Sequence, residues 1–378
     1  MVFYRRHALP EGCAGRIGVS DPKPTTVAIV AAEGVMSSAI AGPFDILSSA
    51  GYIWQVLNED PAAARRFNVS VLARDRGPLR CYQGLTAYAD KALEDMSAPD
   101  IAFVPTVFLP ALFEEPIGIP DAWQPVVDWL GAAYRGGSLV CSNSSGAILL
   151  AEAGLLDGRA ATIHWTLAER ARQKYPAIRF QPDRVLIPEG PGERIVTAGG
   201  GTCWQDLALY LIARFAGSVT AAQTAKSFTI FRKVRGQQPY AEWIPTRNHG
   251  DAAVVRAQEA LHSGFPDAGV MSAALAASGL SSRTFKRRFK AATGQSATDY
   301  IQHLRVKEAR FRLETTNTSI EEIGARIGYR DVGFFRALFR RLVGLTPGQY
   351  REQFGLLEYP GADPFDSAAE PFDAEAAS

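Results

Sequence analysis

SSRTFKRRFKAATG at residues 281–294 and DVGFFRALFRRLVG at residues 331–344 share one layout. Each segment carries two phenylalanines four residues apart, namely Phe285 and Phe289 in the first and Phe335 and Phe339 in the second. Residues spaced by four lie on one face of an α-helix, so the rings form an apolar stripe. Basic residues occupy the opposite face of both segments. The pattern predicts two amphipathic helices of the same design.

A short helix and a glycine turn precede each amphipathic helix. Val270–Ser278 ends at Gly279, and the second short helical segment, IEEIGARIG at residues 320–328, ends at Gly328. Between the two copies, Ala297–Thr315 places apolar residues on one side and predicts a rigid connecting helix. The C-terminal part is therefore predicted to be all-α, with two helix-turn-helix units.

Polar residues at the starts of these helices predict how the helix ends are capped. Ser281 and Ser319 each precede a helical segment and are expected to accept backbone N–H groups of its first turn. Glu322, three residues after Ser319, is expected to complete a capping box. Asp331 opens the second amphipathic helix.

Charge is distributed unevenly along a chain whose net charge is only +1. Leu280–Arg351 contains 15 Lys and Arg against 6 Asp and Glu, which leaves 25 against 33 in the rest of the chain. The two parts therefore carry +9 and −8. A basic module on an acidic body is typical of a nucleic-acid-binding domain joined to another domain, although a solvated basic face gives the same charge.

The basic faces of the two amphipathic helices supply candidate DNA contacts. A recognition helix needs donors that reach base edges in the major groove and cations that reach phosphates. Arg283, Lys286 and Arg287 in the first helix can supply both, and Arg336 is the base-edge candidate in the second helix. An arginine can donate two hydrogen bonds to guanine. The candidate set is Ser282, Arg283, Lys286, Arg287, Arg330, Val332, Gly333, Arg336 and Arg340, with Arg341 as a further phosphate contact.

Over about Val254–Arg351 the chain resembles the AraC/XylS family of bacterial transcription regulators. The resemblance rests on LSSRTFKRRFKAATGQSATDYIQHLRVKEARFRL and SIEEIGARIGYRDVGFFRALFRRLVGLTPGQYR, whose last eight residues match the family's G-x-T-P-x-x-Y-R ending. It implies that the two recognition helices lie in successive major grooves on one face of double-stranded DNA. Val332, Gly333 and Ala337 depart from the family, whose members often have polar residues or arginine there. Base reading is therefore expected to shift toward the first helix.

From Thr25 to about residue 216, short apolar segments alternate with helix-compatible segments. The strand candidates are 25–32, 67–73, 100–105, 138–143, 160–164 and 194–198, and the helix candidates are 39–50, 121–134, 146–153, 165–175 and 204–215. Strands of this length alternating with helices predict an α/β domain, with a parallel sheet covered on both faces. Ligands of such sheets bind at the carboxyl ends of the strands.

This α/β part resembles the class I glutamine-amidotransferase-like superfamily that includes PfpI-type proteins. The stretches AIAGPFDIL, SSGAILLAEAGLLDGRAATIHW and TAGGGTCWQDLALYLIARF carry the resemblance, which implies a flavodoxin-like sandwich. In that superfamily a tight strand-to-helix turn often presents a cysteine nucleophile, aided by an acid and a histidine. Here the nucleophile position falls on Ser144 and the acid position on Ala39, while Cys141 lies earlier in the strand. No catalytic residue is therefore expected.

The same turn suits the binding of a small molecule. Ser142–Ser145 leads into a helix and offers hydroxyls and free amides to a carboxylate or another anion. His164 is expected to add a hydrogen bond, and a tryptophan a flat wall that also attracts a quaternary ammonium. A structural histidine and ordinary core tryptophans are the simpler alternatives. The candidate ligand-binding residues are Asn143, Ser144, Ser145, His164, Trp165 and Trp204.

The expected domain layout follows these patterns. It comprises a flexible tail over 1–23, a ligand-sensing domain over 24–217, a linker over 218–250, a DNA-binding domain over 251–355 and a disordered tail over 356–378. The chain has 4 cysteines without a CxxC pair, so neither a metal site, a disulfide framework nor a cofactor is expected. No apolar run reaches the ~18 residues of a membrane helix, and no signal-peptide pattern is present, which favours a cytoplasmic protein without membrane contact.

Three functions stay open on the sequence. The favoured one is a sequence-specific transcription regulator that binds double-stranded DNA as a homodimer and responds to a small amino-acid-like or amine-containing metabolite. The family resemblance favours activation, with RNA polymerase as a further partner. The second is a serine- or cysteine-dependent amidase with a DNA-binding appendage, in which His164 would activate Ser144. The third is a constitutive DNA binder whose α/β domain only dimerises.

Overall fold

The computed structural model describes residues 23–114 and 117–356. The two expected tails therefore lie outside the described residues, except for their inner ends at Lys23 and Leu356. Contacts divide the described chain into two compact units. One comprises the residues up to Arg159 together with Pro188–Arg232, and the other comprises Ala160–Ile187 together with the residues from Lys233 onward.

Seven strands form one sheet in the order β10-β11-β7-β6-β1-β2-β5. The pairs β1–β2, β1–β6, β6–β7, β7–β11 and β2–β5 are all parallel, which confirms the predicted parallel sheet. These strands are β1 (Thr25–Val30), β2 (Phe67–Ala73), β5 (Lys91–Ala92), β6 (Ile101–Val104), β7 (Leu139–Asn143), β10 (Leu186–Glu189) and β11 (Ile195–Ala198).

Two shorter sheets accompany the main one. β3 (Gly77–Arg80) pairs antiparallel with β4 (Thr86–Ala89). β8 (Ala160–Ala161) pairs in parallel with β9 (Arg179–Phe180). The strand candidate at 160–164 is thus a two-residue strand outside the seven-stranded sheet, and helix α5 (Ala168–Lys174) lies between β8 and β9 in the chain.

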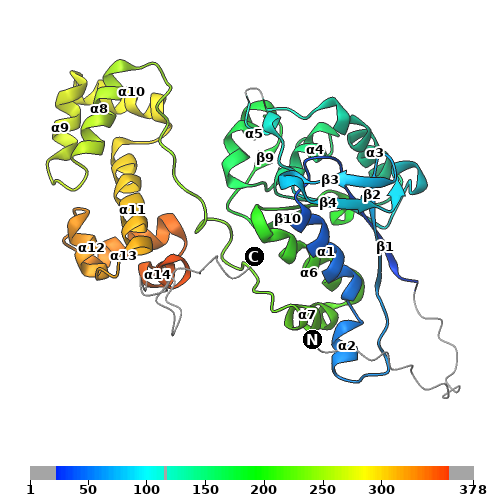
Figure 1. Ribbon diagram of the computed structural model, residues 1–378. Coiled ribbons are helices and arrows are strands. Elements are labelled where there is room, and N and C mark those ends of the chain that lie inside the picture. The colour runs from blue at the N-terminus through cyan, green and yellow to red at the C-terminus, as the bar shows by residue number, and fades with distance from the viewer. Residues whose placement is uncertain (1–22, 115–116, 357–378) are drawn as a thin grey trace, which may run out of the picture. The chain divides into compact units, whose positions relative to one another are not determined.

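Helices pack against the main sheet and against one another. α1 contacts β2 and α6, α3 contacts β7 and α4, and α6 also contacts β11 (Figure 1). Every residue of β6, β7 and β11 is buried, because parallel strands covered on both faces have no side exposed to water. The helices are α1 (Ser37–Ser49), α2 (Ile53–Leu57), α3 (Gln124–Arg135), α4 (Ala147–Glu152), α6 (Trp204–Ala216) and α7 (Ser218–Ser227).

The C-terminal part is all-α, as predicted (Figure 1). Its helices are α8 (Ala252–Ser263), α9 (Val270–Ser278), α10 (Ser282–Thr293), α11 (Ala297–Thr315), α12 (Ile320–Arg326), α13 (Val332–Val343) and α14 (Pro347–Phe354). They enclose two hydrophobic cores, one around α8–α10 and one around α12–α14. The connecting helix α11 serves both, since Tyr300 and Leu304 belong to the first core and Ala309 and Leu313 to the second.

The segment expected to be a linker, residues 218–250, is more ordered than its Gly and Pro content indicates. It begins with helix α7, which packs on α6 and α2. Residues 237–250, called the strap below, contact the helical bundle through side-chain hydrogen bonds and stacked rings. The domain boundaries themselves stay predictions.

Candidate nucleic-acid interface and effector site

The first helix-turn-helix consists of α9 and α10. Gly279 makes the turn with a left-handed φ of 67°, and α10 buries Phe285 and Phe289 with ring centroids 5.4 Å apart. The opposite face exposes the first-helix candidates Ser282, Arg283, Lys286 and Arg287. The predicted cap is wrong in detail, because the Ser281 hydroxyl donates to the Thr284 hydroxyl at 3.0 Å and accepts no backbone N–H.

The second helix-turn-helix consists of α12 and α13. Phe335 and Phe339 are fully buried, as their spacing predicts. The turn requires Gly328, whose φ is +92° and where a Cβ would lie 2.3 Å from the Pro266 carbonyl oxygen. Any larger residue would push α12 away from the loop before α9.

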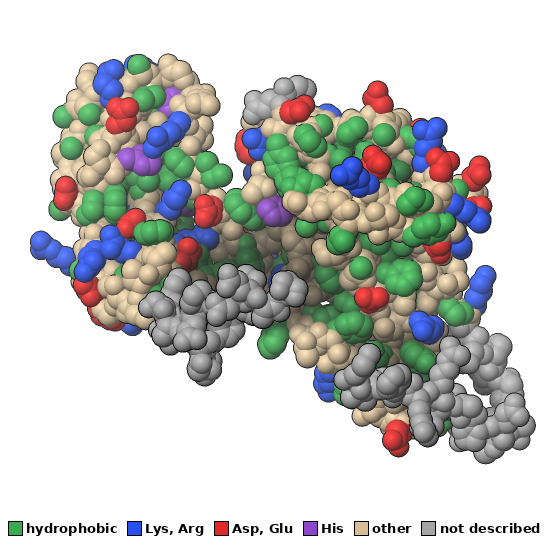
Figure 2. Space-filling view, viewed as in Figure 1, with side chains coloured by type: hydrophobic (Ala, Val, Ile, Leu, Met, Phe, Trp, Pro, Cys, Tyr) green, Lys and Arg blue, Asp and Glu red, His purple; other side chains and the backbone are tan. Residues whose placement is uncertain are grey.

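The candidate residues of the second unit divide by exposure. Gly333, Arg336 and Arg340 are exposed on α13, and Arg330 is exposed in the loop before it. Val332 is half-buried and contributes less surface. Figure 2 shows Lys and Arg side chains, in blue, over α12 and α13.

The caps of α12 and α13 agree in part with the caps predicted from the sequence. The Ser319 hydroxyl accepts the Glu322 N–H at 3.1 Å, and an Asp331 carboxylate oxygen accepts the Phe334 N–H at 3.0 Å. The expected capping box is wrong, because the Glu322 carboxylate accepts from Arg326 at 2.7 Å. An i,i+4 ion pair competes here with the return contact to the helix start.

Arg336, a candidate base reader, has an acidic partner that the sequence pattern did not reveal. Its guanidinium Nη2 lies 2.6 Å from Glu321 Oε1 on α12. The two side chains are 52% and 58% exposed, so water weakens the pair and a phosphate or a base can compete for the arginine.

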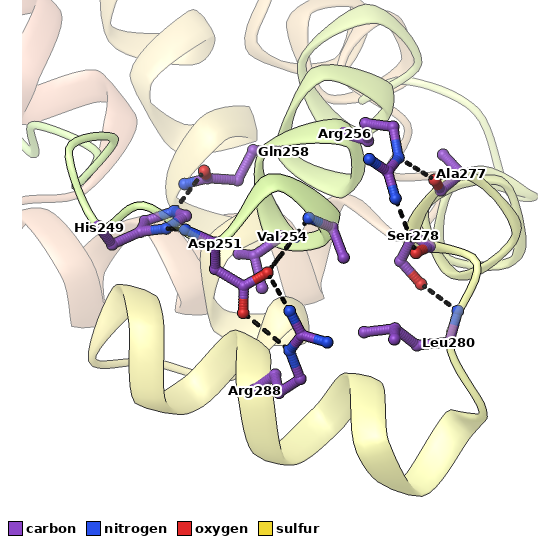
Figure 3. Close-up of polar contacts among 10 residues, drawn as sticks. His249, Asp251, Val254, Arg256, Gln258, Ala277, Ser278, Leu280 and Arg288 are labelled. Carbon is purple, nitrogen blue, oxygen red and sulfur yellow. Dashed lines mark hydrogen bonds and ion pairs between the residues drawn. The ribbon is translucent and has the colours of Figure 1, made fainter.

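Arg288 belongs to the basic residues of α10, but its contacts stabilise the fold. Its guanidinium donates to both carboxylate oxygens of Asp251, the residue that caps α8 (Figure 3). Nearby, Arg256 on α8 donates to the carbonyls of Ala277 and Ser278 at the end of α9. Both arginines tie α8 to the first helix-turn-helix, and neither was separable by sequence from the exposed arginines of α10.

The strap lies along the two helix-turn-helix units. Gln238 Nε2 donates to the carbonyls of Arg341 and Leu342, at 3.1 Å each, and so satisfies acceptors at the end of α13. Trp243 stacks on His303 of α11 with centroids 5.2 Å apart. Arg310 of α11 donates to the strap carbonyls of Ala241 and Pro239. The strap therefore braces α13 against α11.

The strand-to-helix turn expected to bind a ligand follows β7. Ser144 is buried and has a φ of +57°, a left-handed value that a non-glycine residue rarely adopts. The next helix approaches the sheet closely at Gly146, where a Cβ would lie 2.7 Å from the Pro105 carbonyl oxygen and 2.9 Å from that of Val104. Ser144 therefore lies in a strained, tightly packed turn between β7 and α4.

The polar side chains around the turn differ in whether they have hydrogen-bond partners. The Ser145 hydroxyl accepts from the Val107 N–H and donates to the Val107 carbonyl, so its role is structural. Asn143 Nδ2 donates to Thr106 Oγ1 and to the Gly201 carbonyl. Asn143 Oδ1 and Ser142 Oγ are buried without a hydrogen-bond partner among the described residues. A buried acceptor without a donor is costly, and a ligand that supplies an N–H would satisfy it.

The other candidate ligand residues have packing roles of their own. The His164 imidazole accepts the Thr166 N–H and caps the following 3₁₀ turn, Trp165–Leu167. Burial lowers the pKa of His164, which favours the neutral ring. Trp204, in the other unit, packs on α1, where indole atoms lie 2.3–2.7 Å from the position that a Cβ on Gly42 would take.

The groups needed for nucleophilic catalysis are not assembled at the turn. Ala39, at the position of the acid, is 2% exposed and has no functional group. Cys141 lies inside β7, and burial raises the pKa of its thiol well above the ordinary value. Among residues 23–114 and 117–356, no group of three or more His, Cys, Asp and Glu is placed to hold a metal ion.

Two family models match the chain. The DJ-1/PfpI family model matches residues 25–213, which is half of the chain, and a helix-turn-helix domain model matches residues 274–353. Between them they cover the serine turn and both recognition helices. None of the described helices is long and apolar enough to cross a membrane.

Relatives of known name are regulators. The HTH-type transcriptional regulator CdhR of Pseudomonas aeruginosa is 28% identical over 78% of this chain and 84% of its own length. The HTH-type transcriptional regulator GlxA of Rhizobium meliloti is 31% identical over 56% of this chain and 64% of its own length. An AraC family transcriptional regulator from Pseudomonas putida, known as a crystal structure, is 18% identical with a TM-score of 0.44, over 54% of this chain and 100% of that chain.

Proposed function

The chain belongs to the DJ-1/PfpI family, and we propose that it couples a metabolite-sensing domain of this family to a DNA-binding helical domain. The helix-turn-helix domain and the regulators related over most of the chain identify it as a DNA-binding transcription regulator. One observation carries the proposal: two basic helices each bury a phenylalanine pair in a core of their own and turn arginines outward.

The exposed residues of these helices divide into base readers and phosphate contacts. Arg283 and Arg287 on α10 lie in the turns that enter a major groove, where bidentate contacts to guanine give specificity. Ser282, Lys286 and Arg330 add donors, and Arg340, exposed near the end of α13, is the proposed phosphate contact. Val332 and Gly333 would let the backbone of α13 approach the DNA closely.

The test of this function is a selection of genomic fragments by the purified full-length chain at near-physiological salt. A shared motif with two half-sites about one helical turn apart is the expected result. Fragments without a common motif would reduce the basic helices to a non-specific surface and refute sequence-specific regulation.

For the α/β unit we propose a small effector that carries an amine, with the serine turn as its site. Asn143 Oδ1 supports an N–H donor, and Ser144 presents its side chain from a strained turn. Trp204 stays a proposed contact, and Ser145 contributes by holding the turn in place. Isothermal titration against a panel of amino acids and quaternary amines should give heat with at least one. Loss of that heat in Asn143→Leu, which removes the Oδ1 acceptor, would locate the site, whereas no heat with any compound of the panel would refute this ligand class.

We also propose that the α/β unit is not a hydrolase. Ala39 supplies no acid, and the described cysteines, Cys81, Cys141 and Cys203, are all buried. Native protein should therefore leave these three thiols unmodified by iodoacetamide while they react after denaturation. A hyper-reactive thiol among them would favour the amidase alternative.

We further propose that the protein regulates transcription in the cytoplasm as a homodimer. Two protomers would double the phosphate contacts and read paired half-sites. We expect activation, with RNA polymerase as the partner at the promoter. Deletion of the gene should lower reporter expression from the selected promoters, and unchanged or raised expression would refute activation.

A further inference from the structure

The exposed face of α13 is apolar where that of α10 is polar. The buried phenylalanine pairs set a common register, in which Phe335 corresponds to Phe285 and Phe339 to Phe289. In this register the exposed or half-exposed residues Arg283, Thr284 and Arg287 of α10 are replaced on α13 by Gly333, Phe334 and Ala337. The two helices therefore present different chemistry to the same kind of groove.

Phe334 is the largest apolar side chain on this face. It is 49% exposed, although a phenylalanine ring gains free energy by leaving water. Its N–H bonds to the Asp331 cap, which places it in the first turn of α13, and its ring rests against Tyr329 with centroids 5.5 Å apart. The ring is thus positioned at the end of the helix whose residues reach base edges.

The surroundings of Phe334 indicate what covers it. Arg330 precedes it and Arg340 and Arg341 follow it, all exposed, so a surface that brings phosphates to both sides matches the charge. Arg336, the polar side chain of this face nearest the helix start, is paired with Glu321. A protein partner would need to be acidic at the same points, whereas duplex DNA supplies phosphates on both edges of the major groove.

We infer that α13 reads the C5-methyl group of a thymine through Phe334, with Ala337 beside it; this inference rests on the proposed function. The methyl group is the one apolar feature that base pairs present in the major groove, and phenylalanine and alanine are suited to contact it. Half-site recognition is then split: α10 reads hydrogen-bonding edges, and α13 reads a methyl group.

The experiment replaces each thymine of the selected motif, one at a time, by deoxyuridine. This change keeps base pairing and the O4 acceptor and removes only the methyl group. The half-site that α13 contacts is identified as the one whose sequence preference is retained in the Arg287→Ala variant. There, one replacement should weaken binding of the full-length protein about fourfold, the effect of exposing one methyl-sized apolar group.

Variants make the assignment specific to Phe334. In Phe334→Ala the methyl-free and methylated sites should bind equally, within about 1.5-fold, whereas Phe334→Leu should keep part of the difference. Phe311→Ala removes another exposed ring, on α11, and should retain the full fourfold difference. Thermal unfolding of each variant shows whether the fold is kept.

The outcomes separate this inference from the proposed function. A motif with no methyl-dependent position in that half-site would overturn the inference and leave sequence-specific regulation intact. A methyl effect that persists at full size in Phe334→Ala would assign the contact to another residue and also overturn it. Absence of any selected motif would overturn both.

Discussion

The guanidinium of Arg288 forms a two-point ion pair with the carboxylate of Asp251, with Nη2 2.6 Å from Oδ1 and Nε 2.8 Å from Oδ2. The same carboxylate accepts the N–H groups of Ala253 and Val254 and so caps α8. One side chain thereby both caps the start of α8 and connects it to α10. Figure 3 shows this arrangement between the two helices.

Two substitutions of Asp251 should separate its capping role from its ionic role. Asp251→Asn keeps an oxygen that caps α8 and loses the charge, whereas Asp251→Ala loses both and should cost about 1 kcal/mol more of unfolding free energy. Denaturant unfolding, followed by a probe in the helical unit, measures the difference. Equal stability of the two variants would show that the cap contributes nothing.

The same pair predicts a pH dependence. The hydrogen bond from Arg288 holds the pKa of the Asp251 carboxyl below its ordinary value. A carboxyl whose pKa is lowered by folding contributes stability above its unfolded pKa of about 3.9, and that contribution is lost as pH falls through the folded pKa. Asp251→Asn should therefore lose less stability than the wild type between pH 5 and 3, and parallel acid profiles would contradict the prediction.

Arg287→Ala and Arg340→Ala should weaken DNA binding in different ways. Loss of a base contact at Arg287 should cost roughly 1–3 kcal/mol on the selected motif and little on random DNA. Loss of a phosphate contact at Arg340 should weaken binding to the motif and to random DNA alike. It should also lower the slope of the logarithm of affinity against the logarithm of salt concentration by about one. Arg326→Ala, on α12, is a control that removes another exposed arginine. Equal losses for both variants on every sequence would refute this division of roles.

Glu321→Gln should strengthen DNA binding, because it releases Arg336 and removes a negative charge beside the groove-facing surface. We expect a gain of roughly threefold at low salt, with a salt slope steeper by up to about one contact. Glu322→Gln is the matched control, since it makes the same charge change on the same helix and releases Arg326 instead. Equal gains in the two variants would attribute the effect to net charge and not to Arg336.

The serine turn should respond in opposite directions to two small changes. Ser144→Gly removes the strain of a left-handed φ and should stabilise the α/β unit by about 1 kcal/mol, provided that the hydroxyl has no structural role. Gly146→Ala should destabilise it by at least ~1–3 kcal/mol, because the new Cβ meets two carbonyl oxygens of fixed backbone. Thermal unfolding measures both. A destabilised Ser144→Gly would show that the hydroxyl holds the turn.

Several elements were predictable because their signals are local. The spacing of the phenylalanines and the glycines between paired helices predicted α9 and α11 to the residue, and α10, α12 and α13 to within two residues. Short β-branched or apolar runs predicted β1, β2, β6, β7 and β11 of the sheet. The short strands β3, β4 and β5 and the helix α7 carry no comparable pattern and were missed.

The candidate site was predicted less completely than the fold. The exposed arginines of α10 follow from helix periodicity, and the tight turn at Ser144 follows from the strand-to-helix resemblance. The strap contacts of Gln238 and the exposure of Phe334 were not predicted, because the first depends on a segment rich in turn residues and the second on which face the core leaves open.

The sequence by itself determined the architecture: a parallel α/β unit, two helix-turn-helix units and a basic face, all encoded in periodicities of two to four residues. Only the tertiary structure decided which arginines are held by a carboxylate. Arg288 and Arg336 stand in the same basic runs as Arg287 and Arg340, yet each meets a carboxylate from another helix, Asp251 or Glu321. Such pairs join residues 15 or more positions apart, and no local pattern encodes them, since the partner is chosen by how the helices pack.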